Sequence, residues 1–124
     1  MAIVKLYKRD FEESIKEIVT TKDLSVEIKK YASGIESLKI KNAKGYVEVL
    51  PFMGQIIWDL SFNNKSLRLH NIFDMPRKAK TIIDTYGCFA FHSGLLANGC
   101  PAPDDTHQMH GEFSVMDINE VYLE

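Results

Sequence analysis

The residue types best suited to chemistry gather in one stretch of this chain. Three of its four histidines and several carboxylates lie between positions 92 and 112. Imidazoles beside carboxylates can shuttle protons near neutral pH, hydrogen-bond the hydroxyls of a sugar, or ligate a divalent metal ion. The candidate site residues are His92, Asp104, Asp105, His107, His110 and Glu112.

The spacing of these residues leaves several kinds of site open. His107 and His110 are separated by two residues, a pairing found in many loops, and the His-x-His spacing of cupin-like metal sites is absent. Ser93 lacks the glycine-flanked turn of a serine nucleophile. In a structural interpretation, Asp104 and Asp105 cap turns and the histidines hydrogen-bond buried carbonyl groups. We expect no metal ion and no cofactor, with a cupin-like metal-binding β-sandwich and the structural role as alternatives.

An amino-terminal helix is predicted to lie over the body of the fold. Asp10 and Glu13 have the spacing of a capping pair. Apolar residues then follow at helical spacing from Phe11 to Val19, with charged residues on the other face. The pattern predicts one amphipathic helix over residues 10–20, with a structural role.

Short strands are predicted after Asp23, because apolar and polar residues alternate there. Ser37–Leu50 has turn residues at its centre, which predicts a β-hairpin. A strand is predicted over Ile56–Phe62, with Trp58 in the core. The partner of that strand is expected to return through Leu67 and Leu69.

Two segments, 70–87 and 94–111, are predicted to be irregular loops, and together they hold three of the four prolines. Long loops inside a compact domain are commonly functional, and the second carries most of the candidate site. Phe113–Leu123 returns to strand character and is expected to present an open edge, which offers a route to homo-oligomers. We expect residues 1–124 to form a single, incomplete domain.

Composition excludes several classes of partner. Fifteen basic against seventeen acidic residues give a net charge of -2, so no positive field is available to attract nucleic acid. The apolar stretch Ala2–Val4 is too short for a signal peptide or a membrane span, which predicts a cytoplasmic protein without a membrane partner. Cys88 and Cys100 show no ligand spacing and are expected to be buried thiols.

Three blocks of sequence, Leu50–Trp58, Tyr86–Phe89 and Cys100–Glu112, resemble in order the aldose 1-epimerase (galactose mutarotase) superfamily, in a branch of uncharacterised substrate. The resemblance covers about residues 33–124 and only the amino-terminal portion of family members, which run to roughly twice this length or more. The last block is the most specific, because His110 and Gly111 match the His-Gly motif of the superfamily's sugar site.

The resemblance implies a mainly β fold, an antiparallel β-sandwich that is part of a galactose mutarotase-like supersandwich, with the one amino-terminal helix. It implies an aldose 1-epimerase-like carbohydrate-binding protein that opens the ring of a sugar or sugar derivative by acid and base catalysis. His110 would be catalytic and hydrogen-bond near the ring oxygen, while Gly111 would let the backbone approach the sugar. The implied substrate-binding residues are His92, Asp105, His107, His110, Gly111 and Glu112.

The family's second histidine and its general-base glutamate lie beyond the matched region. The resemblance therefore assigns one member of the catalytic pair, and the expected ligand is a sugar or sugar-like small molecule. A non-catalytic carbohydrate-binding or assembly module is the second functional hypothesis.

Overall fold

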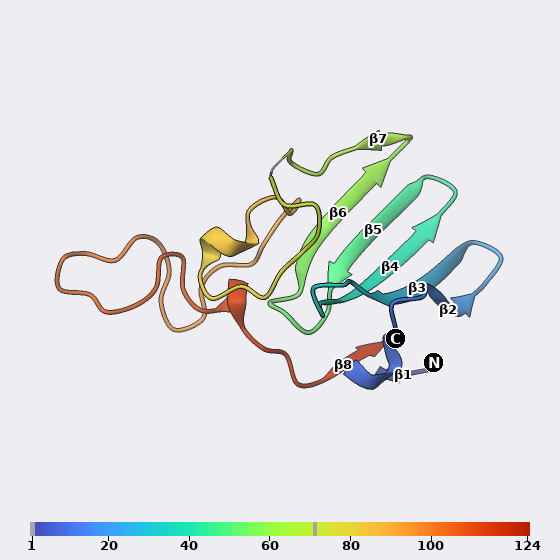
Figure 1. The fold of residues 1–124 in the computed structure, drawn as a ribbon, viewed down its shortest axis with the longest axis horizontal. Helices are drawn as coiled ribbons and strands as arrows, with labels where there is room; N and C mark the ends of the chain where they lie inside the picture. Colours follow the sequence, from blue (N-terminus) through green and yellow to red (C-terminus); the bar gives the residue numbers. More distant parts are fainter. Residues whose placement is uncertain (1, 71) are drawn as a thin grey trace.

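An antiparallel six-stranded sheet forms the body of the protein (Figure 1). The computed structural model describes residues 2–70 and 72–124. Neighbouring strands follow one another in the chain, and every neighbouring pair is antiparallel. The predicted mainly β, antiparallel fold is thus confirmed. The strands are β2 (Lys16–Thr20), β3 (Leu24–Lys30), β4 (Glu36–Asn42), β5 (Gly45–Leu50), β6 (Ile56–Phe62) and β7 (Lys65–Ser66).

A second, two-stranded sheet brings the two ends of the chain together (Figure 1). In it, β1 (Val4–Leu6) pairs antiparallel with β8 (Val121–Leu123). The sequence predicts strand character over Phe113–Leu123. In the structure only β8 belongs to a sheet, and Phe113–Val115 forms the 3₁₀ turn η3. The terminal strand therefore has a partner within the chain, and homo-oligomers through it stay a prediction.

The predicted amino-terminal helix over residues 10–20 is wrong. Lys8–Asp10 forms a single 3₁₀ turn, η1, in which the Asp10 carboxylate accepts a hydrogen bond from the Tyr7 N–H at 2.8 Å. Of the apolar residues at helical spacing, Ile18 and Val19 lie in β2, which pairs with β3 across an irregular register, and the earlier ones precede this strand. Its β-branched residues Ile18, Val19 and Thr20 favour this extended form. Among the described residues, no helix is long and apolar enough to cross a membrane.

The hairpin predicted over Ser37–Leu50 is confirmed as β4 and β5. The Asn42 side chain accepts hydrogen bonds from the N–H groups of Lys44 and Gly45, at 2.8 and 3.1 Å, which closes the turn. The strand predicted over Ile56–Phe62 is confirmed as β6. Its expected partner is shorter than predicted, because β7 ends before Leu67, which is exposed.

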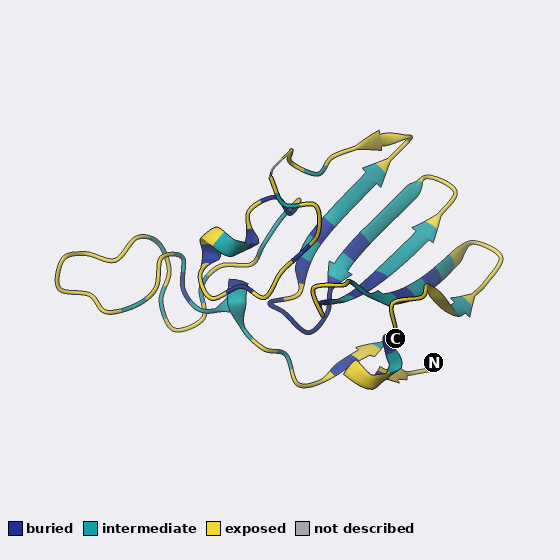
Figure 2. Cartoon of the chain, in the orientation of Figure 1, coloured by how far each residue is buried: buried dark blue, intermediate teal, exposed yellow. Residues whose placement is uncertain are grey.

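Two apolar clusters hold the sheet to the remaining segments (Figure 2). The first joins β3 and β4 to the β1/β8 sheet and includes Phe11, whose ring meets that of Phe52 edge-on at 5.6 Å. The second joins β5 and β6 to the loops beyond residue 76 and contains Trp58. This side chain is 2% exposed, so the prediction that Trp58 lies in the core is confirmed. Both cysteines are free thiols, but only Cys88 is buried, so the prediction of burial is wrong for Cys100.

A carboxylate is buried on the polar face of the sheet, opposite the first cluster. Glu48 is 2% exposed and accepts hydrogen bonds from the hydroxyls of Tyr31 and Ser37, each at 2.5 Å. The ammonium of Lys39 lies 3.3 Å from its other oxygen. Burial, the largest influence, raises the pKa of Glu48. The hydrogen bonds and nearby lysines outweigh it, and they hold that pKa below its ordinary value.

Candidate functional site

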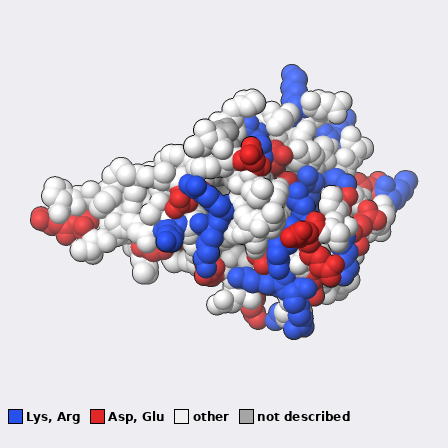
Figure 3. Space-filling model, in the orientation of Figure 1, with Lys and Arg blue, Asp and Glu red and all other residues white. Residues whose placement is uncertain are grey.

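The loop that carries most of the predicted site residues extends away from the sheet (Figure 1) and has acidic side chains at its tip (Figure 3). Its base is closed where Gly94 and Gly111 meet in a parallel bridge. The Gly94 N–H donates to the His110 carbonyl at 2.8 Å, and the N–H groups of Glu112 and Phe113 donate to the Gly94 carbonyl at 3.2 Å. These bonds fix the ends of an otherwise irregular segment.

Gly111 stands where two parts of the loop backbone come close together. It has a φ of +78°, and a Cβ there would lie 2.2 Å from the carbonyl oxygen of Ala97 and 2.6 Å from that of Gly94. Such separations are far inside van der Waals contact. Gly111 therefore permits a close approach between two segments of the loop itself. The resemblance implied instead that it lets the backbone approach a sugar.

His110 is held by its backbone while its side chain stays available. Its φ is +61°, a left-handed conformation in which histidine, asparagine and aspartate are found more often than other residues that carry a Cβ. The His110 N–H donates to the Gly99 carbonyl at 2.8 Å. The half-buried imidazole lies 6.4 Å from the Phe91 ring, and within the described residues neither ring nitrogen has a hydrogen-bond partner. A ligand can therefore use both nitrogens.

His92 resembles His110 in this respect. It is exposed, and its ring meets that of Phe113 edge-on at 5.3 Å. No hydrogen bond to its imidazole is formed by the part of the chain that the structure describes. Both histidines thus lie against aromatic side chains near the closed base of the loop.

Three other predicted residues use their polar atoms inside the loop. The Asp105 carboxylate accepts a hydrogen bond from the Ala102 N–H at 2.8 Å, as a turn-capping side chain does. His107 Nδ1 lies 2.8 Å from the Gln108 carbonyl oxygen, and its Nε2 lies 3.6 Å from Asp105. The Glu112 carboxylate accepts from the Leu96 N–H at 3.1 Å. The Asp105 contact matches the turn-capping role that the structural interpretation assigns to it. Asp104 is exposed, and the carbonyl that His107 contacts is exposed rather than buried.

A groove lined by Phe91, the ring neighbour of His110, adds residues that the sequence did not single out as a site; His110 itself does not line it. Its volume is about 340 Å³, within the range of small-molecule pockets, and its walls are largely apolar. Phe91 lines the groove and also contacts the His110 ring. The sequence signal that could have indicated this groove is the group of aromatic residues at 86, 89 and 91, close to glycine in an irregular segment. The remaining lining residues are Leu69, His70, Tyr86, Gly87, Cys88, Phe89 and Ala90.

The metal alternative finds no ligand set here. Across residues 2–70 and 72–124, no three side chains of histidine, cysteine, aspartate or glutamate are grouped so that they could hold a metal ion. His107 and His110 in particular point to different surroundings, the first to Asp105 and the second to Phe91.

Comparisons with known proteins do not assign a family. No protein-family model matches the chain, and neither a curated protein nor a solved structure is significantly similar to it. The function is therefore argued from the residues and the geometry of the site.

Proposed function

We propose that this protein binds an aldose or a sugar derivative in the groove beside His110, as an aldose 1-epimerase-like protein whose sheets form part of a galactose mutarotase-like sandwich. The observation that carries the proposal is the state of His110. Its backbone has a left-handed conformation, and its imidazole, free of hydrogen bonds within the described residues, lies 6.4 Å from the ring of Phe91, which lines an aromatic groove. Backbone strain of this kind gathers at ligand sites.

The groove has the chemistry that a sugar ring requires. The C–H faces of a pyranose pack against aromatic rings, here supplied by Tyr86, Phe89 and Phe91. The ring nitrogens of His110 are able to donate to or accept from the hydroxyls, and one of them to protonate a ring oxygen. We also propose a cytosolic location, in keeping with two cysteines that are free thiols.

A non-catalytic sugar-binding role is favoured by one specific observation. Ring opening needs a base on the anomeric hydroxyl as well as an acid on the ring oxygen. Of the carboxylates in and beside the loop, those of Asp105 and Glu112 already accept hydrogen bonds from backbone N–H groups of the loop. We therefore propose that this chain recognises sugar without completing the catalytic pair.

Titration with a panel of aldoses, followed by NMR, tests both parts of the proposal. We expect weak binding that His110→Ala reduces about tenfold, since it removes hydrogen bonds to the ligand. His107→Ala is the matched control, because that imidazole serves the loop, and it should retain binding. Anomer exchange in the same samples should stay at the uncatalysed rate. Equal losses in both variants, or no binding by either the wild type or the control, would reject the His110 site.

A further inference from the structure

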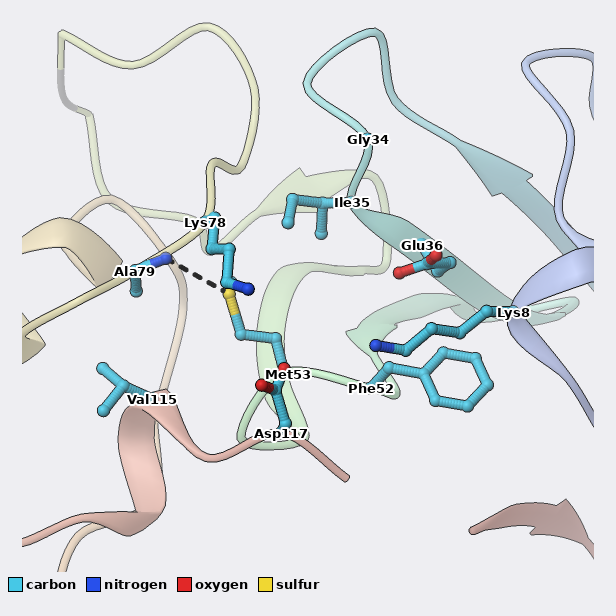
Figure 4. Close-up of a pocket in the computed structure, with 10 residues that line it drawn as sticks. All are labelled: Lys8, Gly34, Ile35, Glu36, Phe52, Met53, Lys78, Ala79, Val115 and Asp117. Atoms are coloured by element: carbon cyan, nitrogen blue, oxygen red, sulfur yellow. Dashed lines mark hydrogen bonds between the residues drawn. The ribbon is translucent and has the colours of Figure 1, made fainter. Parts of the chain in front are cut away.

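A second cavity lies where five segments of the chain meet (Figure 4). Its volume is about 150 Å³, and none of its lining residues belongs to the loop 94–111. The cavity is partly open to solvent, and its volume matches that of cavities that hold a six-membered ring. The segments come from η1, the β3–β4 turn, the β5–β6 connection, residues 78–79 and residues 115–117.

The inner part of this cavity is apolar and held firmly. Phe52 and Met53 are 4% and 7% exposed, and Ala79 and Val115 complete the wall. The Ala79 N–H donates to the Met53 sulfur at 3.5 Å, which ties the loop before η2 (Ile82–Thr85) to the β5–β6 connection. The cavity is therefore preformed by contacts within the chain.

Two ammonium groups point into the cavity from opposite sides. Lys8 reaches in from η1 and Lys78 from the loop on the other side (Figure 4). The Lys8 ammonium lies 5.6 Å from the centre of the Phe52 ring. Among residues 2–70 and 72–124, no carboxylate lies within ion-pair distance of either lysine. Two unpaired cations beside an apolar wall favour the approach of an anion.

The acidic residues of the cavity cancel only part of this charge. Glu36 is already shared with Lys30, whose ammonium lies 3.8 Å from its carboxylate. Asp117 is exposed at the rim and is the remaining carboxylate of the lining. Its oxygens are hydrogen-bond acceptors and suit hydroxyl groups of a ligand.

We propose that this cavity binds a small hydroxylated organic anion. Its carboxylate or phosphate lies between Lys8 and Lys78, and its body, about the size of a six-membered ring, packs against Phe52 and Met53. Asp117 accepts hydrogen bonds from its hydroxyls. The site is separate from the groove beside His110, and the inference does not rest on sugar binding there.

Four probes separate the parts of this inference. Glucuronate and glucose 6-phosphate present the anion on a ring, glucose lacks the charge, and inorganic phosphate lacks the ring. We expect at least one ring anion to bind and to shift the Met53 methyl signal in a saturable manner. The affinities are taken from this signal, because calorimetry would also register an aldose bound in the aromatic groove. Glucose and inorganic phosphate should bind about tenfold more weakly or not at all, because each forfeits one set of contacts. A comparison of the affinities for glucuronate and glucose 6-phosphate shows whether the cavity prefers a carboxylate or a phosphate.

Lysine variants locate the binding. Lys78→Gln should lower the affinity for the ring anion about tenfold, since it removes a charge-assisted hydrogen bond. Lys80→Gln is the matched control, an exposed lysine two residues away that does not line the cavity, and it should leave the affinity unchanged. Equal affinity of the two variants would overturn the proposal. So would glucose or phosphate binding as tightly as the ring anions, or the absence of binding by any ring anion.

Discussion

Replacing Gly111 by alanine is expected to unfold the loop around His110 and to destabilise the whole chain by about 4 kcal/mol or more. The new Cβ would meet the carbonyl oxygens of Ala97 and Gly94 at 2.2 and 2.6 Å, and the Gly94 backbone cannot retreat without breaking the bridge at the base of the loop. Chemical denaturation measures the loss, and the backbone NMR signals of residues 94–111 report where it occurs.

Gly99→Ala is the control for this variant. Gly99 has a similar φ of +75°, but no atom lies within 4 Å of the position its Cβ would take. Gly99→Ala should therefore lower the free energy of unfolding only by the cost of holding alanine in a left-handed conformation, about 1–2 kcal/mol. If the two variants lose the same stability, the close packing of the loop on Gly111 is disproved.

Removal of the Glu48 carboxylate is expected to have a comparable effect on the sheet. Glu48→Ala leaves the hydroxyls of Tyr31 and Ser37 without their acceptor and Lys39 without its partner, which should cost about 3–5 kcal/mol. Glu27→Ala, which breaks the partly exposed pair with Lys41, is the control and should cost about 1 kcal/mol or less. A small loss at Glu48 would contradict the account of the buried network.

The same carboxylate should make stability depend on pH. The pKa of Glu48 is lowered by folding, so the unfolded chain binds its proton more readily than the folded one. Its contribution is complete above the unfolded pKa, about 4.3, and is lost as the pH falls through the lower folded value. Glu48→Gln cannot titrate, so the wild type should lose more stability than this variant between about pH 5 and pH 3. Parallel pH profiles would show that folding does not lower the pKa of Glu48.

The local sequence pattern was enough to predict those parts of the fold that depend on residues close together in the chain. The hairpin of β4 and β5 and the strand β6 follow from alternation and from turn residues that act within a few positions. The segment Lys16–Thr20 fits helical and extended periods alike. Pairing with β3, together with its β-branched residues, makes it a strand. That preference is decided by tertiary contact rather than by spacing.

The candidate site was predictable in its residues but less so in their roles. The sequence places Asp105, His107 and His110 in the predicted loop 94–111 and His92 and Glu112 just outside it, next to the base that Gly94 and Gly111 close. It cannot show that Gly111 meets the Ala97 carbonyl, or that Phe91 links His110 to a groove, because these contacts depend on the path of an irregular backbone. The same holds for β1 and β8, which pair from opposite ends of the chain.

The most direct test of the sugar site is the imidazole signal of His110 during titration with an aldose. The chain has only four histidines, so each carbon-bound imidazole proton can be assigned by single substitutions. Sugar bound beside the free ring nitrogens should shift the His110 signal in a saturable manner and leave that of His107, which is engaged with the loop, nearly unchanged. A saturable shift of His107 alone, or no shift at any histidine up to high aldose concentration, would contradict sugar binding at His110.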